Sequence, residues 1–330
     1  MHKELELWQF IADRLEQSQP VMLLVVATSS GSSPGRPGYK MAVAEDGELM
    51  GSIGGGVMEV NLVEQSRAIL LEPPVVAGGL TLPIREQIHR KNVPNSSGMI
   101  CSGKQTVLFK LLTAKDVDTV HAAANGVKTR NGSSLQIATD SIKVVPPKAR
   151  AQNLEIEFKR RSDDDFEFRE RLGAKNELLI IGGGHCSLAL SEMVTKMDFH
   201  ISLFDDRPQL NTIQKNEFAD EITVVDSYEK IGECVEPNER AYVVIMTLGY
   251  KTDATVIRQL INKDFKYFGV LGSKAKMATL FRELIGEGYS KEKLDNIRTP
   301  IGLPINSHSP EEIAISIAAE IIAVKNGTKT

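Results

Sequence analysis

The stretch from Glu177 to Arg207 constrains the fold of this chain more than any other part of the sequence. A short apolar run ends at Ile181, and it is followed by three consecutive glycines, Gly182 to Gly184, and then by apolar residues at helical spacing. A second apolar run ends at Phe204, and Asp205 comes directly after it. This order of strand, glycine turn, helix, strand and acid predicts the βαβ unit of a Rossmann-type domain.

The glycine turn of this unit suits a phosphate-bearing ligand. Gly182 and Gly184 stand in a G-x-G-x-x-S arrangement with Ser187, so the backbone can turn sharply and a phosphate can approach without a Cβ in the way. The helix that follows offers unpaired N–H groups to an anion. Asp205 lies near the position from which such units hydrogen-bond a ribose hydroxyl. His185 is an unusual occupant of this turn, so the residues leave open whether the ligand is a dinucleotide.

The composition limits the classes of partner. The chain has 330 residues, which suggests about two domains, and its 25% charged and 42% hydrophobic residues are ordinary for a soluble globular protein. A net charge of −4 argues against nucleic acid as the main partner. The longest apolar run, Val21 to Ala27, is too short to span a bilayer, and the N-terminus has no signal-peptide pattern. Three cysteines without C-x-x-C spacing favour a reducing cytoplasm.

The rest of the C-terminal half repeats the alternation of strand and helix. Three further apolar runs are separated by helical patterns between residues 222 and 286, which predicts a parallel, doubly wound sheet. Ligands bind at the carboxyl ends of such strands, where Gly272, Ser273 and Lys274 join Asp205. Lys274 either neutralises a phosphate or is a solvated lysine at a helix start, and we favour the ligand contact.

The N-terminal half indicates an α+β domain. Its patterns predict helices at residues 3–17, 57–71 and 116–127, strands at 21–28, 41–44, 48–53, 74–84, 98–112 and 134–138, and turns or loops at 31–38, 89–97 and 145–147. The charged segment 155–171 is either an exposed hairpin or the connection between domains. We place the boundary near Leu172 and expect an N-terminal α+β domain, 1–172, followed by a Rossmann-like doubly wound parallel-sheet domain, 173–330.

A second triple glycine, Gly54 to Gly56, again joins a predicted strand to a predicted helix. Glu59, one turn into that helix, would repel a phosphate. It therefore hydrogen-bonds a heterocycle, accepts a proton, or acts as a capping acid that the helix dipole stabilises. Cys101 precedes Ser102 and Gly103, so it is either a buried structural thiol or a thiol exposed at a turn.

Several uncommon motifs run along the chain. The N-terminal half carries GSSPGRPGYKMAVAEDGELMGSIGGGVMEVNL and ICSG, and the C-terminal half carries LLIIGGGHCSLAL, DDRP, TLGYKTD, YFGVLGSKAKM and PIGLPINSHSPEEIAISIAAEIIAV. Together they resemble the motifs of the XdhC/CoxI family, the accessory factors of molybdenum hydroxylases such as xanthine dehydrogenase. The motifs occur in the order expected of that family, and they cover most of the chain.

The resemblance implies a non-catalytic chaperone that binds molybdenum cofactor, which is molybdopterin or its dinucleotide form. Such a protein supports sulfuration of the cofactor by a cysteine desulfurase and delivers it to a hydroxylase client. Together with the reasoning above, the candidate cofactor-binding residues are Ser33, Arg36, Gly54, Gly55, Gly56, Glu59, Cys101, Gly182, Gly184, His185, Asp205, Gly272, Ser273 and Lys274, with Cys101 as the soft ligand for a metal or sulfur centre. The apolar helix after Ser309 suits a homodimer interface.

Three positions depart from the family pattern: Ser102, Tyr250 and Asn306. Tyr250 replaces a histidine and so removes an imidazole that could titrate or ligate a metal near neutral pH.

Two alternative functions stay open. A Rossmann unit also permits an NAD(P)-dependent oxidoreductase, although no Ser-Tyr-Lys or His-Asp set stands out beyond Tyr250 with Lys251. The other alternative is a nucleotide-sensing regulatory module.

Overall fold

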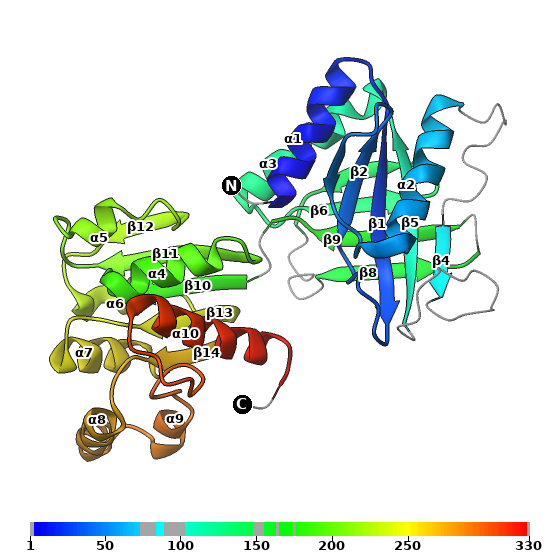
Figure 1. Ribbon diagram of the computed structural model, residues 1–330. Coiled ribbons are helices and arrows are strands. Elements are labelled where there is room, and N and C mark those ends of the chain that lie inside the picture. The colour runs from blue at the N-terminus through cyan, green and yellow to red at the C-terminus, as the bar shows by residue number, and fades with distance from the viewer. Residues whose placement is uncertain are drawn as a thin grey trace. The chain divides into compact units, whose positions relative to one another are not determined.

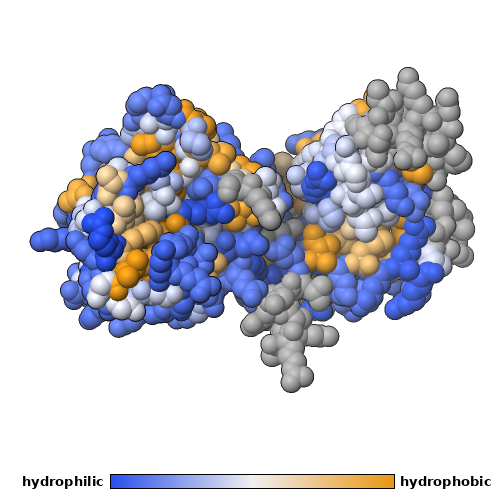
Figure 2. Space-filling view, turned by 90° about the horizontal axis from the view of Figure 1, so that it is seen from below, coloured by the Kyte–Doolittle hydropathy of each residue, from blue (hydrophilic) through white to orange (hydrophobic). Residues whose placement is uncertain are grey.

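The structure is a computed structural model that describes residues 3–72, 84–88, 103–147, 155–162, 165–173 and 176–328. The chain divides into two compact units, Met1–Gly173 and Ala174–Thr330, each with its own sheets and helices (Figure 1). No helix in the described ranges is long and apolar enough to cross a membrane. Hydrophilic residues predominate on the face seen in Figure 2, and the hydrophobic ones form separate areas.

In its described residues, the first unit is built from antiparallel sheets and three α-helices. Its elements are α1 (Lys3–Glu16), β1 (Val21–Ser30), β2 (Lys40–Ala44), β3 (Leu49–Gly51), α2 (Gly56–Leu71), β4 (Ile84–Ile88), β5 (Lys104–Leu112), the 3-10 turn η1 (Ala114–Asp116), α3 (Val117–Thr129), β6 (Ser134–Ala138), β7 (Ile142–Val145), β8 (Ile156–Arg160) and β9 (Phe166–Arg171). One sheet has the strand order β3-β2-β1-β5-β4 and the other β7-β6-β9-β8. The predicted α+β architecture is confirmed.

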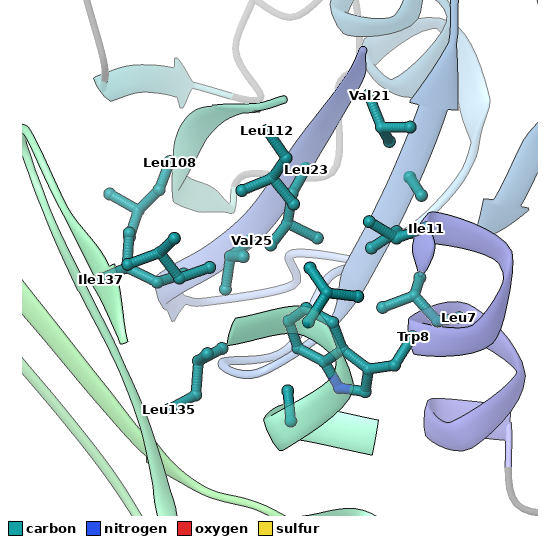
Figure 3. Packing of buried hydrophobic residues seen from close by; sticks show 14 of the residues in the cluster. Leu7, Trp8, Ile11, Val21, Leu23, Val25, Leu108, Leu112, Leu135 and Ile137 are labelled. Atoms are coloured by element: carbon teal, nitrogen blue, oxygen red, sulfur yellow. The ribbon is translucent and has the colours of Figure 1, made fainter. Parts of the chain in front are cut away.

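Strand β1 is the centre of the first unit because both of its faces are covered. Leu23 and Val25 pack on one side with Trp8 of α1 (Figure 3). Met22 and neighbouring side chains pack on the other side with Met58 of α2. A strand that is buried on both faces is a continuous apolar run, which is why the segment was predictable from sequence.

The charged segment 155–171 is the hairpin β8–β9, and it is not a connection between domains. Strand β9 pairs with β6, and Phe166 and Phe168 on one of its faces are buried in the core of the first unit. The hairpin is therefore exposed only in part, because the alternation of Phe with charged residues places one face inward. One further boundary differs from the prediction: Val145 ends strand β7, where the sequence predicts the start of a turn. Most of the strand predicted at 74–84, the loop predicted at 89–97 and the first residues of the strand predicted at 98–112 lie outside the described residues.

A buried lysine anchors the end of the loop at residues 31–38. Lys40 Nζ lies 2.5 Å from Glu170 Oε2 and 3.0 Å from Glu4 Oε1, and it donates to the Gly38 carbonyl at 3.2 Å. Burial alone would lower the pKa of Lys40, but the two carboxylates outweigh it and raise that pKa. The contacts tie α1, β2 and β9 to the loop that approaches the first glycine turn.

The second unit is a parallel sheet with helices on both faces. Its elements are β10 (Asn176–Ile181), α4 (His185–Val194), β11 (Phe199–Asp205), α5 (Asn211–Gln214), β12 (Glu221–Val224), the 3-10 turn η2 (Tyr228–Lys230), α6 (Ile231–Cys234), β13 (Asn238–Ile245), α7 (Tyr250–Leu260), β14 (Phe265–Val270), α8 (Lys274–Gly286), α9 (Lys291–Asp295) and α10 (Pro310–Lys325). Helices α4, α5 and α10 cover one face, and α6, α7, α8 and α9 cover the other (Figure 1).

The strand order β12-β11-β10-β13-β14 confirms the Rossmann-like prediction. Strand β10 pairs in parallel with β11 on one side and β13 on the other. After β10 the chain adds β11 and β12 on one side of it and then crosses to add β13 and β14 on the other side. Ligands of doubly wound sheets bind at such a switch point, outside the carboxyl ends of the strands. The glycine turn after β10 lies at this edge.

Candidate functional site

The first glycine turn needs glycine for its backbone conformation. Gly54, Gly55 and Gly56 have φ angles of 129°, 79° and 72°, which L side chains rarely adopt. A Cβ on Gly54 would lie 2.6 Å from the Gly35 nitrogen, whereas a Cβ on Gly55 would meet nothing within 4 Å. Gly54 therefore packs backbone against backbone, and Gly55 borders open space.

The carboxylate of Glu59 folds back onto this turn. Its Oε2 accepts hydrogen bonds from Ser52 Oγ at 2.7 Å, from the Ile53 N–H at 2.8 Å and from the Gly55 N–H at 3.0 Å. Glu59 thus supplies the anion of the turn itself, which favours the capping role among those left open by the sequence. Within the described ranges Oε1 has no hydrogen-bond partner, so it is available as an acceptor.

Gln105 holds the parts of this region together, and sequence reasoning missed it. Its side chain is fully buried at the start of β5. Oε1 accepts from Ser33 Oγ at 2.7 Å and from the Gly35 N–H at 3.3 Å, and Nε2 donates to the Ile53 carbonyl at 3.3 Å. One amide therefore joins the loop at 31–38, the glycine turn and β5. The sequence feature that could have identified Gln105 is a single amide side chain next to the apolar run of β5.

Gly103 brings the start of β5 against the same loop. A Cβ there would lie 2.4 Å from the Ser33 nitrogen, so the two backbones approach closely. The predicted ligand Cys101 lies outside the described residues. Arg36 is exposed, and no ion pair of its side chain occurs within the described parts of the chain.

The second glycine turn depends on packing more than on backbone conformation. Gly182 has φ 105°, and a Cβ there would lie 2.3 Å from the Met246 carbonyl oxygen. A Cβ on Gly183 would lie 2.5 Å from the Ile213 side chain. Gly184 has φ −72° and open space where its Cβ would be, directly before α4. The buried Ser187 donates its hydroxyl to the Gly182 carbonyl, which holds the turn on the helix.

Asp205 is fully buried at the end of β11, and four hydrogen bonds saturate its carboxylate. Oδ2 accepts from the Gly183 N–H at 2.6 Å and from Arg207 Nη2 at 2.6 Å. Oδ1 accepts from the Arg207 N–H at 2.8 Å and from Arg207 Nε at 2.9 Å. Burial alone would raise the pKa of Asp205, but these bonds outweigh it and hold that pKa below its usual value. A ribose hydroxyl would have to displace one of these donors.

His185 is exposed as the first residue of α4, and the next residue, Cys186, is half-buried. Burial, followed by the charge of Glu311 at the start of α10, raises the pKa of the Cys186 thiol. In the part of the chain that is described, no group of three His, Cys, Asp or Glu side chains could hold a metal ion.

The residues after β14 include a lysine contact that the sequence analysis did not predict. Ser273 caps α8, since its Oγ accepts from the Lys276 N–H at 3.3 Å, and Lys274 is exposed without a described partner. Lys276 Nζ instead donates to Asp253 Oδ2 at 2.7 Å. Asp253 is buried in the first turn of α7 and also accepts from Thr247 Oγ1 at 2.5 Å. The sequence feature that could have identified Asp253 is an acid at a position of the helical pattern that faces the core.

Two departures from the family pattern have structural accounts. Asn306 has φ 58°, and asparagine tolerates this left-handed conformation better than other non-glycine residues, so it can stand where a glycine is usual. Tyr250 packs against the hydrophobic core on the α7 side of the sheet. Its ring therefore belongs to the packing of the second unit. Ser102 lies outside the described residues.

Comparison with known families matches both units. Residues 178–321 match the XdhC Rossmann domain, and residues 14–76 match the XdhC and CoxI family. These matches include both glycine turns, Glu59 and Asp205.

Individual relatives are similar over nearly the whole chain. The uncharacterized protein YqeB of Escherichia coli is 24% identical over 315 residues; the alignment covers 94% of this chain but 44% of that protein, so the chain spans less than half of its length. A Bacillus subtilis protein described as a probable subunit of xanthine dehydrogenase is 24% identical over 329 residues, with 94% of this chain and 95% of that protein covered. A crystal structure described as a xanthine dehydrogenase from Bacillus halodurans superposes with a TM-score of 0.72 at 22% identity, covering 100% of this chain and 97% of that one, and it supports the fold.

Proposed function

The chain belongs to the XdhC and CoxI family, and on that premise we propose that it is a non-catalytic accessory protein of a molybdenum hydroxylase such as xanthine dehydrogenase. In this proposal it binds molybdenum cofactor, holds it while a cysteine desulfurase sulfurates it, and delivers it to the hydroxylase. Its similarity to a probable xanthine dehydrogenase subunit of Bacillus subtilis supports an association with that class of enzyme.

The observation that carries the proposal is the meeting of three distant segments at Gln105. The loop with Ser33, the glycine turn after Ile53 and the start of β5 are joined through this one buried side chain. Buried hydrogen bonds of this kind hold a site rigid, because breaking one leaves a polar group unsatisfied. The segments that carry the family motifs in the first unit thus form one candidate site.

The chemistry of Glu59 fits a pterin better than a phosphate at this turn. One carboxylate oxygen already occupies the Ile53 and Gly55 N–H groups, so a phosphate would meet negative charge there. The second oxygen is an acceptor, and a pterin ring carries several N–H donors. We therefore assign Glu59 and the open space beside Gly55 to the heterocycle, with Arg36 as the cation available to the cofactor's phosphate.

Cys101 is the proposed soft ligand for the metal or sulfur centre. It lies two residues before Gly103, whose backbone approaches Ser33. Thiolates suit soft centres, and this residue is the cysteine nearest in sequence to the candidate site.

Native mass spectrometry of the full chain, expressed with an intact molybdenum cofactor pathway, tests the proposal. We expect the wild type to retain pterin and molybdenum. Glu59→Gln keeps an acceptor for the turn but removes the charge, and it should retain about tenfold less cofactor. Cys101→Ala should fold normally and lose most of the metal. Cys234→Ala, an exposed free cysteine of the other unit, is the matched control and should change nothing.

The same spectra distinguish the alternatives. Bound NAD(P) with hydride transfer and no affinity for pterin would contradict the accessory role and favour an oxidoreductase. Normal cofactor retention by Cys101→Ala would make that cysteine structural. The measured mass of the native assembly also tests the proposed homodimer.

A further inference from the structure

The ion pair at the end of β11 offers donors at the place where a Rossmann domain binds the ribose of a nucleotide. Asp205 has no exposed surface and no free acceptor position, because two groups of Arg207, the Arg207 backbone and Gly183 fill its oxygens. The carboxylate therefore cannot take the two ribose hydroxyls as in NAD-binding domains without giving up existing bonds.

Asp205 holds the guanidinium of Arg207 but occupies only some of its N–H donors. A guanidinium has five N–H groups, and Arg207 places two of them on Asp205, which leaves three. Its side chain is 33% exposed, and beyond these two the guanidinium makes no further hydrogen bond within the described residues. A buried carboxylate that fixes the conformation of an arginine prepares the remaining N–H groups to bind an anion, because little rotamer entropy of the arginine is then lost on binding.

The pair lies directly beside the glycine turn. Asp205 Oδ2 bonds both the Gly183 N–H and Arg207 Nη2 at 2.6 Å, so the guanidinium and the turn share one oxygen. Gly184 leaves open space before α4 on the same turn. In nucleotide-binding Rossmann domains a pyrophosphate lies at this helix, and a nearby arginine accommodates a phosphate on the ribose 2′ oxygen.

We propose that the second unit binds a dinucleotide of the NADP type, with Arg207 bonding the ribose 2′-phosphate and Asp205 positioning Arg207. This ligand is separate from molybdopterin, and the proposal stands whether or not the first unit binds that cofactor. The exposed Asp206, whose Oδ1 is 3.7 Å from Arg207 Nε, is the group that opposes a phosphate there. Asp206 is also an acid with an exposed carboxylate for a ribose hydroxyl.

Isothermal titration calorimetry of the full chain with NADP⁺ and NAD⁺ tests this assignment. We expect NADP⁺ to bind at least about tenfold tighter, because charge-assisted hydrogen bonds to a phosphate are worth roughly that factor or more. Asp206→Asn should strengthen NADP⁺ binding by about twofold to fivefold and leave NAD⁺ unchanged, since it removes a repulsive charge. If Asp206 bound the ribose hydroxyls instead, the same variant would weaken NAD⁺ binding.

Variants of the pair itself complete the test. Arg207→Gln alone would leave Asp205 buried without its cation, so the double variant Asp205→Asn with Arg207→Gln keeps a neutral pair. It should abolish the preference for NADP⁺ while NAD⁺ binding changes less than about threefold. Equal affinity of the wild type for the two nucleotides, tighter NAD⁺ binding, or no binding of either at about 1 mM would overturn the proposal. The wild-type comparison and Asp206→Asn decide the matter even if the double variant does not fold.

Discussion

The two triple-glycine turns have the same sequence and the same kind of internal partner, yet they present opposite chemistry. In each turn a carboxylate accepts a hydrogen bond from a glycine N–H: Glu59 from Gly55, and Asp205 from Gly183. The carboxylate of Glu59 has a second oxygen without a described partner. That of Asp205 is saturated, and three of its four hydrogen bonds come from Arg207.

The difference shows that a glycine turn by itself does not specify a phosphate site. The acid that folds onto the turn, and the cation that does or does not accompany it, decide which charge is presented to a ligand. The first turn therefore offers an acceptor, which suits a heterocycle with N–H groups. The second offers guanidinium donors, which suit a phosphate.

The largest expected effects come from the glycines that pack backbone against backbone. Gly182→Ala would force a Cβ to within 2.3 Å of the Met246 carbonyl oxygen, where the paired strands β10 and β13 end. We expect it to lower the free energy of unfolding of the second unit by about 4 kcal/mol. Gly54→Ala would place a Cβ 2.6 Å from the Gly35 nitrogen, a less severe overlap, and should cost about 3 kcal/mol.

Urea unfolding followed by hydrogen–deuterium exchange assigns each loss to one unit. Gly286→Ala, at the end of α8 with open space around it, is the matched control and should change stability by less than about 0.5 kcal/mol. A larger loss for Gly54→Ala than for Gly182→Ala would reverse the comparison of the two turns.

The next effect concerns the acids. Asp205→Ala leaves the Gly183 N–H and the Arg207 guanidinium without their acceptor, and we expect a loss of about 3 kcal/mol in the second unit. Glu59→Ala removes a less buried carboxylate without a described cation and should cost about 1 kcal/mol in the first unit. Thermal unfolding of both variants measures the difference, and equal losses would show that the two acids stabilise their turns alike.

The response to acid should separate the turns further. Because the pKa of Asp205 is lower in the folded chain than its ordinary value near 3.9, its contribution is present above that value and is lost as pH falls through the folded pKa. Asp205→Asn should therefore flatten the loss of stability of the second unit below about pH 4. Urea midpoints between pH 3 and 7 measure this, and Glu59→Gln is the control for removing an acid at a glycine turn. An unchanged acid limb in Asp205→Asn would contradict the assigned pairing.

Much of the fold was predictable because its signals are local. The order of apolar run, glycines and helical pattern around Gly182 specifies a βαβ unit within about thirty residues. The two-sided burial of β1 appears in the sequence as an uninterrupted apolar run. Segment 155–171 was harder to interpret, because its charges obscured the alternation that buries Phe166 and Phe168.

The site was less predictable because its partners are distant in the chain. Gln105 bonds residues more than fifty positions away, and nothing in the local pattern names Ser33 and Ile53 as its partners. The prediction of a ligand contact at Lys274 rests on its place at a helix start, and no local pattern indicates that Lys276 bonds the buried Asp253. Asp205 was correctly placed at a strand end, but its saturation by Arg207 depends on side-chain geometry.

The smallest expected effects are at the two glycines that border open space, and they sharpen the comparison most. Gly55→Ala meets no atom, so its cost is only that of the backbone at φ 79° and ψ −172°, a region that essentially only glycine adopts, on the order of 1–2 kcal/mol. Gly184→Ala meets no atom either and has φ −72°, so its effect should stay within about 0.5 kcal/mol. Urea unfolding measures both. If Gly184→Ala cost more than Gly55→Ala, the space before α4 would not be open, and the place of a ligand pyrophosphate beside Arg207 would be lost with it.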